Sequence, residues 1–92
     1  MKAMKAIVTV LGNDNVGIIA AVCAKLSEYN INILDISQTI LQEKFTMIMS
    51  VDLDRANARF SDVAAGLQEL GRQRSLSIHI QREEIFDAMH TI

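Results

Sequence analysis

Apolar and polar residues follow two different periods along this chain. Four segments either alternate between the two kinds or form a short apolar run, as β-strands do. Two longer segments place apolar residues three or four positions apart, which gives a helix one apolar face. The predicted strands span residues 6–11, 32–41, 44–53 and 76–81, and the predicted helices span about 16–29 and 60 to between 71 and 74.

Polar residues between these segments indicate how the elements begin and end. Asn13 or Asp14 offers an N-cap for the first helix, and Asn57 offers one for the second. Asn30 tolerates the left-handed conformation that ends many helices. Gln42–Glu43 is a tight polar turn, so the two strands beside it are predicted to form a hairpin.

The order of elements predicts the fold class. It is β-α-β-β-α-β followed by a tail at about 83–91, in which Ile85, Phe86 and Met89 have the spacing of a short docked helix. This order is typical of the α+β, ferredoxin-like split-βαβ fold, a four-stranded antiparallel sheet with two helices on one face. We therefore expect residues 1–92 to form one such domain with a short C-terminal helix.

The predicted fold leaves apolar surface without a cover. Residues 6–11 are apolar on both faces of their strand, whereas both helices are expected on the same side of the sheet. A chain of 92 residues is too short to add a third layer. Pairing with a second copy through a sheet edge, a sheet face or the helices would bury this surface, so we expect a homodimer.

Composition excludes several classes of protein and partner. Half of the residues are hydrophobic, no proline occurs and there are only four glycines, so linkers and disorder are not expected. A net charge of −2 provides no basic surface for nucleic acid. No apolar run reaches the roughly 20 residues of a membrane span, and no signal peptide is evident. With Cys23 as its single cysteine, the chain is expected to be cytoplasmic.

The residue types used in catalysis are scattered. His79 is predicted to lie in a strand and His90 in the tail, both distant from Cys23 in the deduced layout. Acylphosphatases have the same order of elements, but they need an arginine in the first strand-to-helix loop. Residues 12–17 contain neither arginine nor lysine, so this phosphate chemistry lacks its cation. We expect no enzymatic activity.

Metal and cofactor sites are not expected either. Cysteine and histidine do not occur at zinc-ligand spacing, and the glycine-rich nucleotide motifs are missing from the sequence. The carboxylates at 52 and 54, and those at 83 and 84, fit strand ends and a helix start better than a metal centre.

The polar loop after the first strand is the main candidate site. Because it opens a helix, the free backbone N–H groups around Asn15 to Ile18 favour a carboxylate. Asp14 can accept hydrogen bonds from an ammonium group, and Gly17 permits a ligand to approach the backbone. Asn32, at the start of the next strand, is both a donor and an acceptor. Together these groups suit a zwitterion such as a small amino acid.

A purely structural interpretation of the same residues stays open. Asp14 can cap the helix, Gly17 can pack the helix on the strand, and Asn32 can complete a turn. None of these roles needs a ligand.

Three motifs together resemble the ACT domain family. They are VTVLGNDNVGII at residues 8–19, LSEYNINILDISQ at residues 26–38, and QREEIFDAMH at residues 81–90. The last resembles the tail of small stand-alone ACT proteins of bacteria and archaea, and the likeness covers nearly the whole chain. It implies a regulatory module that binds an amino acid or another small effector between paired domains, as in accessory proteins of the glycine-cleavage repressor type.

The serine-binding regulatory domain of phosphoglycerate dehydrogenase provides a residue-level comparison. By position, Asp14 matches a ligand-contacting asparagine of its first loop, and Asn32 matches an asparagine that the partner subunit contributes. Two positions differ, because Gly12 stands where that family has a contacting histidine and Val16 replaces a common loop proline. These differences do not favour serine as the ligand.

Two hypotheses of function follow from the residues and the resemblance. The first is a non-enzymatic module that binds an amino acid between the first loop of one subunit and the second strand of another. The alternative is a ligand-free interaction subunit that docks on an enzyme or a transcriptional regulator. For the first hypothesis the expected ligand-binding residues are Gly12, Asn13, Asp14, Asn15, Val16, Gly17, Ile18, Asn32, Ile33 and Asp35.

Overall fold

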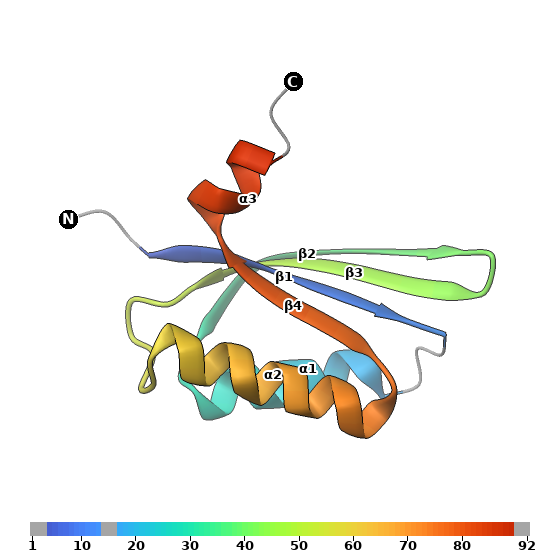
Figure 1. The fold of residues 1–92 in the computed structure, drawn as a ribbon, viewed down its shortest axis with the longest axis horizontal. Helices are drawn as coiled ribbons and strands as arrows, with labels where there is room; N and C mark the ends of the chain where they lie inside the picture. The colour runs from blue at the N-terminus through green and yellow to red at the C-terminus, as the bar shows by residue number, and fades with distance from the viewer. Residues whose placement is uncertain (1–3, 14–16, 90–92) are drawn as a thin grey trace.

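Strands and helices occur in the order that the sequence predicts. The structure is a computed structural model that describes residues 4–13 and 17–89. The predicted C-terminal helix is among its elements (Figure 1). The elements are β1 (Lys5–Gly12), α1 (Ile18–Glu28), β2 (Asn32–Leu41), β3 (Lys44–Asp52), α2 (Phe60–Arg74), β4 (Ser77–Arg82) and α3 (Glu83–Met89).

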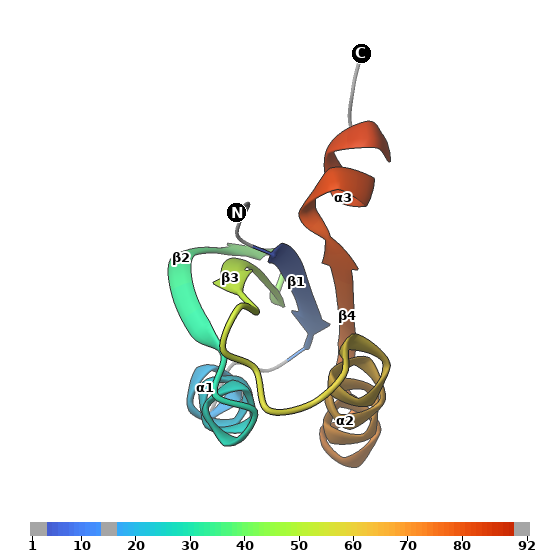
Figure 2. The same cartoon turned by 90° about the vertical axis from the view of Figure 1, so that its left-hand side faces the viewer.

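The four strands form one antiparallel sheet in the order β2-β3-β1-β4. Helices α1 and α2 lie side by side on one face of this sheet, and α3 rises on the opposite side beyond the end of β4 (Figures 1 and 2). The two central strands are β1 and β3, so β2 and β4 are the edges. This arrangement confirms the ferredoxin-like fold with a short C-terminal helix.

The core lies between the helices and the sheet. Alternate residues of β1 and β3 point toward the helices and are buried, as their period of two predicts. Apolar residues of α1 and α2 close this layer from the other side. The residues with no exposed surface are Ala6, Val8, Val10, Val22, Leu26, Met47, Met49, Val51, Val63 and Leu67.

Two apolar surfaces stay exposed outside this core. On the sheet face away from α1 and α2, Leu11 and Ile48 are exposed on neighbouring central strands. On the edge strand β2, Leu34, Ile36 and Ile40 are exposed as well. A bulge at Leu34 interrupts the pairing of β2 with β3. After it, Ile36 and Ile40 pair with the buried Met49 and Phe45, but on this edge strand they are themselves exposed.

The predicted ends of the elements are partly confirmed. Asn30 has a φ of 58°, so the predicted left-handed residue is present, and the predicted turn at Gln42–Glu43 joins β2 to β3 with φ values of 51° and 69°. The predicted helix caps are wrong. Gly17 is the N-cap of α1 and Arg59 is the N-cap of α2, and neither helix has a side-chain cap.

These caps differ from expectation for local reasons. The described candidate Asn13 lies before the loop and too far from the first turn of α1, and Asp14 lies outside the described residues. Asn57 lies two positions before the N-cap of α2, and its side-chain amide instead donates to a carbonyl at the end of α1.

Replacing Gly71 by alanine is expected to destabilise the fold. A Cβ atom at this position would lie 2.6 Å from the carbonyl oxygen of Leu76. That backbone is held in place because the Leu76 N–H donates to the Gly71 carbonyl at 2.7 Å. We expect Gly71→Ala to lower the free energy of unfolding by about 1–3 kcal/mol in urea titrations. Exposed Gln73→Ala on the same helix is the control. A more stable Gly71→Ala, as helix propensity alone would give, contradicts this packing.

The hairpin turn offers a stabilising change. Leu41 pairs with Lys44, so Gln42 and Glu43 form a two-residue turn in which both have positive φ. Glycine adopts this conformation without the steric cost of a side chain. Glu43→Gly is expected to raise the free energy of unfolding by about 0.5–1 kcal/mol. Glu43→Ala removes the same charge but keeps the strain, so an equal gain from both variants would refute the conformational explanation.

Candidate functional site

The predicted loop lies where β1 passes into α1. Gly12 is the buried last residue of β1, and Asn13 after it is exposed. Gly17 is exposed with a φ of 72°, a backbone conformation that favours glycine. Ile18 begins the helix and is buried in the core. The predicted site residues 14–16, Asp14, Asn15 and Val16, lie outside the described residues.

The start of α1 presents backbone donors at the protein surface. The first intrahelical bond here runs from the Ala21 N–H to the Gly17 carbonyl at 3.0 Å. The N–H groups of the residues before Ala21 have no partner within the helix. Since no acidic side chain lies in the first turn of α1, these donors can face an anionic group.

The other three predicted site residues lie on β2. Asn32 is its exposed first residue, and Ile33 is half-buried against the core. Asp35 is exposed after the bulge, and its carboxylate accepts a hydrogen bond from the Ile36 N–H at 2.9 Å. Asn32 is therefore the residue of this group whose side chain is best placed for a ligand.

One chain does not bring the loop and Asn32 together. At one end of the sheet Asn32 pairs with Asp52, which pairs in turn with Lys5. Gly12 pairs with Phe45 at the other end. With a rise of roughly 3.4 Å per residue, the two ends are separated by about 24 Å. The described residues of the predicted site therefore form two separate groups within a protomer.

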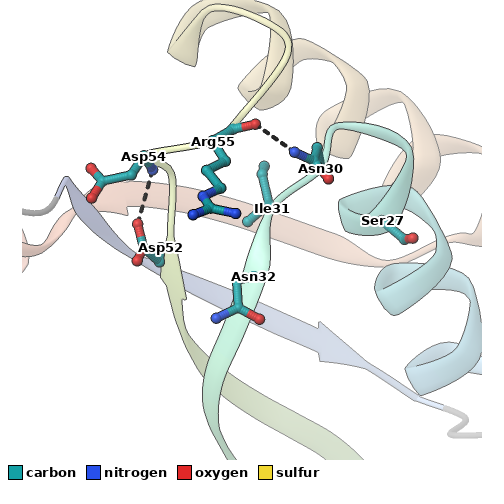
Figure 3. A pocket seen from close by; sticks show the side chains of 7 residues that line it. All are labelled: Ser27, Asn30, Ile31, Asn32, Asp52, Asp54 and Arg55. Atoms are coloured by element: carbon teal, nitrogen blue, oxygen red, sulfur yellow. Dashed lines mark hydrogen bonds between the residues drawn. The ribbon is translucent and has the colours of Figure 1, made fainter.

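Asn32 lines a cleft at its own end of the sheet (Figure 3). The cleft has a volume of about 530 Å³ and opens where α1 ends, β2 begins and β3 ends. Its lining is mostly polar and includes one cation. The lining residues are Ser27, Asn30, Ile31, Asn32, Asp52, Asp54 and Arg55.

Two side-chain amides fix the loop that carries Arg55 to the end of α1. The Asn30 amide donates to the Arg55 carbonyl at 2.8 Å, and the Asn57 amide donates to the Glu28 carbonyl at 3.0 Å. The Asn57 N–H also donates to the Tyr29 carbonyl at 2.9 Å. The two bonds from Asn57 satisfy carbonyls that the helix end leaves free. Together with the bond from Asn30 they hold the backbone of Arg55 in place.

The two carboxylates of the cleft hold the turn after β3. The Asp54 N–H donates to Asp52 Oδ1 at 2.9 Å, and the Met4 N–H donates to Asp54 Oδ1 at 2.7 Å. In Figure 3 the Asp54 side chain points away from the cleft, whereas the Arg55 side chain extends into it toward the level of Asn32. Among the described residues, Arg55 makes no ion pair, so its guanidinium is available to a ligand.

Sequence reasoning missed Arg55. The residue lies in a short polar connection without a motif, and its position over Asn32 depends on the bonds to the end of α1. The available signal in the sequence was the pair of asparagines at 30 and 57, because a side-chain amide near a helix end can donate a hydrogen bond to a carbonyl of a neighbouring segment.

Other chemistry-bearing groups do not form a second centre within residues 4–13 and 17–89. His79 is exposed and hydrogen-bonded to the Ser77 hydroxyl at 3.0 Å. No three His, Cys, Asp or Glu residues there are grouped to share a metal ion. Across the same part of the chain, none of the helices is long and apolar enough to cross a membrane.

Comparison with known proteins identifies the family. The family model for the ACT domain matches residues 5–81. A UPF0237 protein of Listeria monocytogenes is 52% identical over 89 residues, which are 97% of this chain and 100% of the relative. A UPF0237 protein of Clostridium acetobutylicum is 54% identical with the same coverage. The solved structure of an ACT domain protein from Streptococcus pneumoniae covers 97% of this chain and 100% of its own, with a TM-score of 0.82 and 43% identity. This chain therefore belongs to the ACT domain family.

Proposed function

We propose that this protein is a non-enzymatic regulatory module of the cytoplasm that binds an amino acid at the interface of a homodimer. ACT domains are typically regulatory modules that bind small molecules, which supports the general class. The observation that carries the proposal is the separation of the two groups of site residues to opposite ends of one sheet. A second copy is then needed to complete the site.

Antiparallel pairing of β2 with β2 of a second copy would meet this need. Since β2 is an edge strand, its outer backbone groups are free to pair. If the two-fold axis passes near Ile36, Asn32 of one protomer lies level with Ile40 of its partner. Ile40 is paired with Phe45, which is paired with Gly12, so this is the end of the sheet that carries the loop. Each dimer would contain two equivalent sites.

The residues that meet in this arrangement suit an amino acid. The N–H groups at the start of α1 would bind the α-carboxylate, helped by the helix dipole. Gly17 leaves room for the ligand to approach the backbone, and the Asn32 amide would bind across the interface. Asp14 remains the expected acceptor for the ammonium group.

Exposed apolar residues on the same edge support the dimer. Leu34, Ile36 and Ile40 have large exposed surfaces although they lie in a strand. Burial of such side chains stabilises an interface by about 25 cal/mol per Å² of apolar area removed from water. Pairing through β2 would cover them together with the free backbone groups.

A second candidate function is docking on a protein partner without a ligand. Its specific support is the open sheet face, where Leu11 and Ile48 are diagonal neighbours and exposed. Ile85 of α3 is exposed too, on a helix that lies on this side of the sheet (Figure 2). A partner that covers this face could bind while the β2 edge stays in the homodimer.

Amino-acid binding can be tested by thermal shift with the twenty common amino acids. Under the proposal at least one of them stabilises the protein, by about 2.7 kcal/mol at a hundredfold excess over its dissociation constant. Asn32→Ala and Asp14→Ala should each weaken the effect. Gln68→Ala, an exposed amide on α2, should leave it unchanged. If no amino acid raises the melting temperature of the unsubstituted protein, the ligand-free alternative is favoured instead.

The dimer can be tested with two isoleucines of equal exposure. Ile36 on the β2 edge is 39% exposed and Ile48 on the open sheet face is 40% exposed. We expect Ile36→Lys to give monomers in analytical ultracentrifugation, because it places a charge in the interface. Ile48→Lys should stay dimeric. The opposite result would assign the interface to the open face.

A further inference from the structure

We propose that the cleft beside Asn32 binds the side chain of the amino acid and selects a carboxamide, through Arg55 and Asp52. This inference rests on the proposed function, since it assumes that the ligand's α-carboxylate and ammonium groups lie at the junction of the partner's loop with Asn32. The side chain of the ligand would then extend into the cleft. Its volume of about 530 Å³ is ample for an amino-acid side chain.

The polar groups of the cleft are complementary to a carboxamide. Arg55 contributes N–H donors, which would bind the carbonyl oxygen of the ligand. Asp52 uses Oδ1 for the Asp54 N–H. Its second oxygen accepts no hydrogen bond from the described residues, so it would be an acceptor for the amide NH₂ group. Asn32 provides both kinds of group beside them (Figure 3).

The charge of the lining decides between a carboxamide and a carboxylate. One arginine and two aspartates line the cleft, but the Asp54 side chain points away from it (Figure 3), so Arg55 and Asp52 are the charged groups that a ligand would meet and their charges balance. A ligand with an acidic side chain would add a further negative charge next to Asp52 and would lose the hydrogen bond to that carboxylate. Like charges at short range disfavour binding, whereas a neutral amide uses both the donor and the acceptor.

The position of Arg55 is set before any ligand binds. Its backbone carbonyl accepts the bond from Asn30, and the same loop is tied to Tyr29 and Glu28 through Asn57. Only the side chain has to order when a ligand arrives. Because the backbone is already fixed, binding costs less conformational entropy than it would at a mobile surface arginine. This favours a role of Arg55 in ligand recognition.

Calorimetric titration with glutamine, asparagine, glutamate and aspartate tests the proposal. The unsubstituted protein should bind the better of the two amides at least tenfold more tightly than the matching acid. Arg55→Met should weaken amide binding about ten- to a hundredfold, as expected for the loss of a hydrogen bond to a charged group. Arg59→Met is the matched control, because Arg59 lies nearby in sequence but lines a different cleft.

Asp52→Asn provides a change of specificity that a purely structural role would not produce. Asparagine keeps an oxygen for the Asp54 N–H but replaces the second acceptor by a donor. The preference should therefore move from the amide toward the acid, while unfolding measurements show that the variant is folded. Arg55→Met should also be folded, because Asn30 binds its backbone and not its side chain.

The possible failures are distinguishable. If the unsubstituted protein binds an amino acid but neither Arg55→Met nor Asp52→Asn changes its affinity or its preference, the selection of a carboxamide is wrong and the proposed function stands. If the unsubstituted protein binds the acids more tightly than the amides, the selection of a carboxamide is likewise wrong and the proposed function stands. Binding of no amino acid at all would overturn the proposed function and this inference together.

Discussion

The antiparallel register of the sheet sets the distance between the two groups of predicted site residues. β1 pairs with both β3 and β4, and β3 pairs with β2, so each residue has a fixed level along the sheet. Gly12 is held at one end and Asn32 at the other. Shifting this register by one residue would turn the buried side chains of β1 toward the open face. The packing of the core therefore fixes the separation of the two groups of site residues.

The cleft depends on a second constraint, the connection between the end of α1 and the loop after β3. Asn30 and Asn57 supply hydrogen bonds that cross between these segments. Both bonds are exposed, and each is worth about 1 kcal/mol net. The contacts between the end of α1 and this loop thus place Arg55 in the same cleft as Asn32. The way in which α1 ends therefore helps to form the site.

Much of the fold could be predicted because it depends on local patterns. The period of β3 gives its buried face, and the left-handed Asn30 follows from its residue type at a helix end. The turn at Gln42–Glu43 follows from its place between two strands. The hydrogen bond of Asn57 and the position of Arg55 could not be predicted, because each depends on a segment distant in sequence. Asn57 offers an amide to whichever free carbonyl lies nearest, and only the packing of α1 makes that group Glu28.

The separation of the two groups of site residues also links ligand binding to dimerisation. In the proposed dimer the ligand contacts the loop of one protomer and Asn32 of the other, so it binds the dimer in preference to the monomer. By linkage, ligand then stabilises the dimer as much as dimerisation raises the affinity for ligand. In that dimer the open face, where Leu11 and Ile48 are exposed, would lie outside the interface and would stay accessible to a partner. Such a module could report the level of an amino acid through its own assembly, without a change of fold.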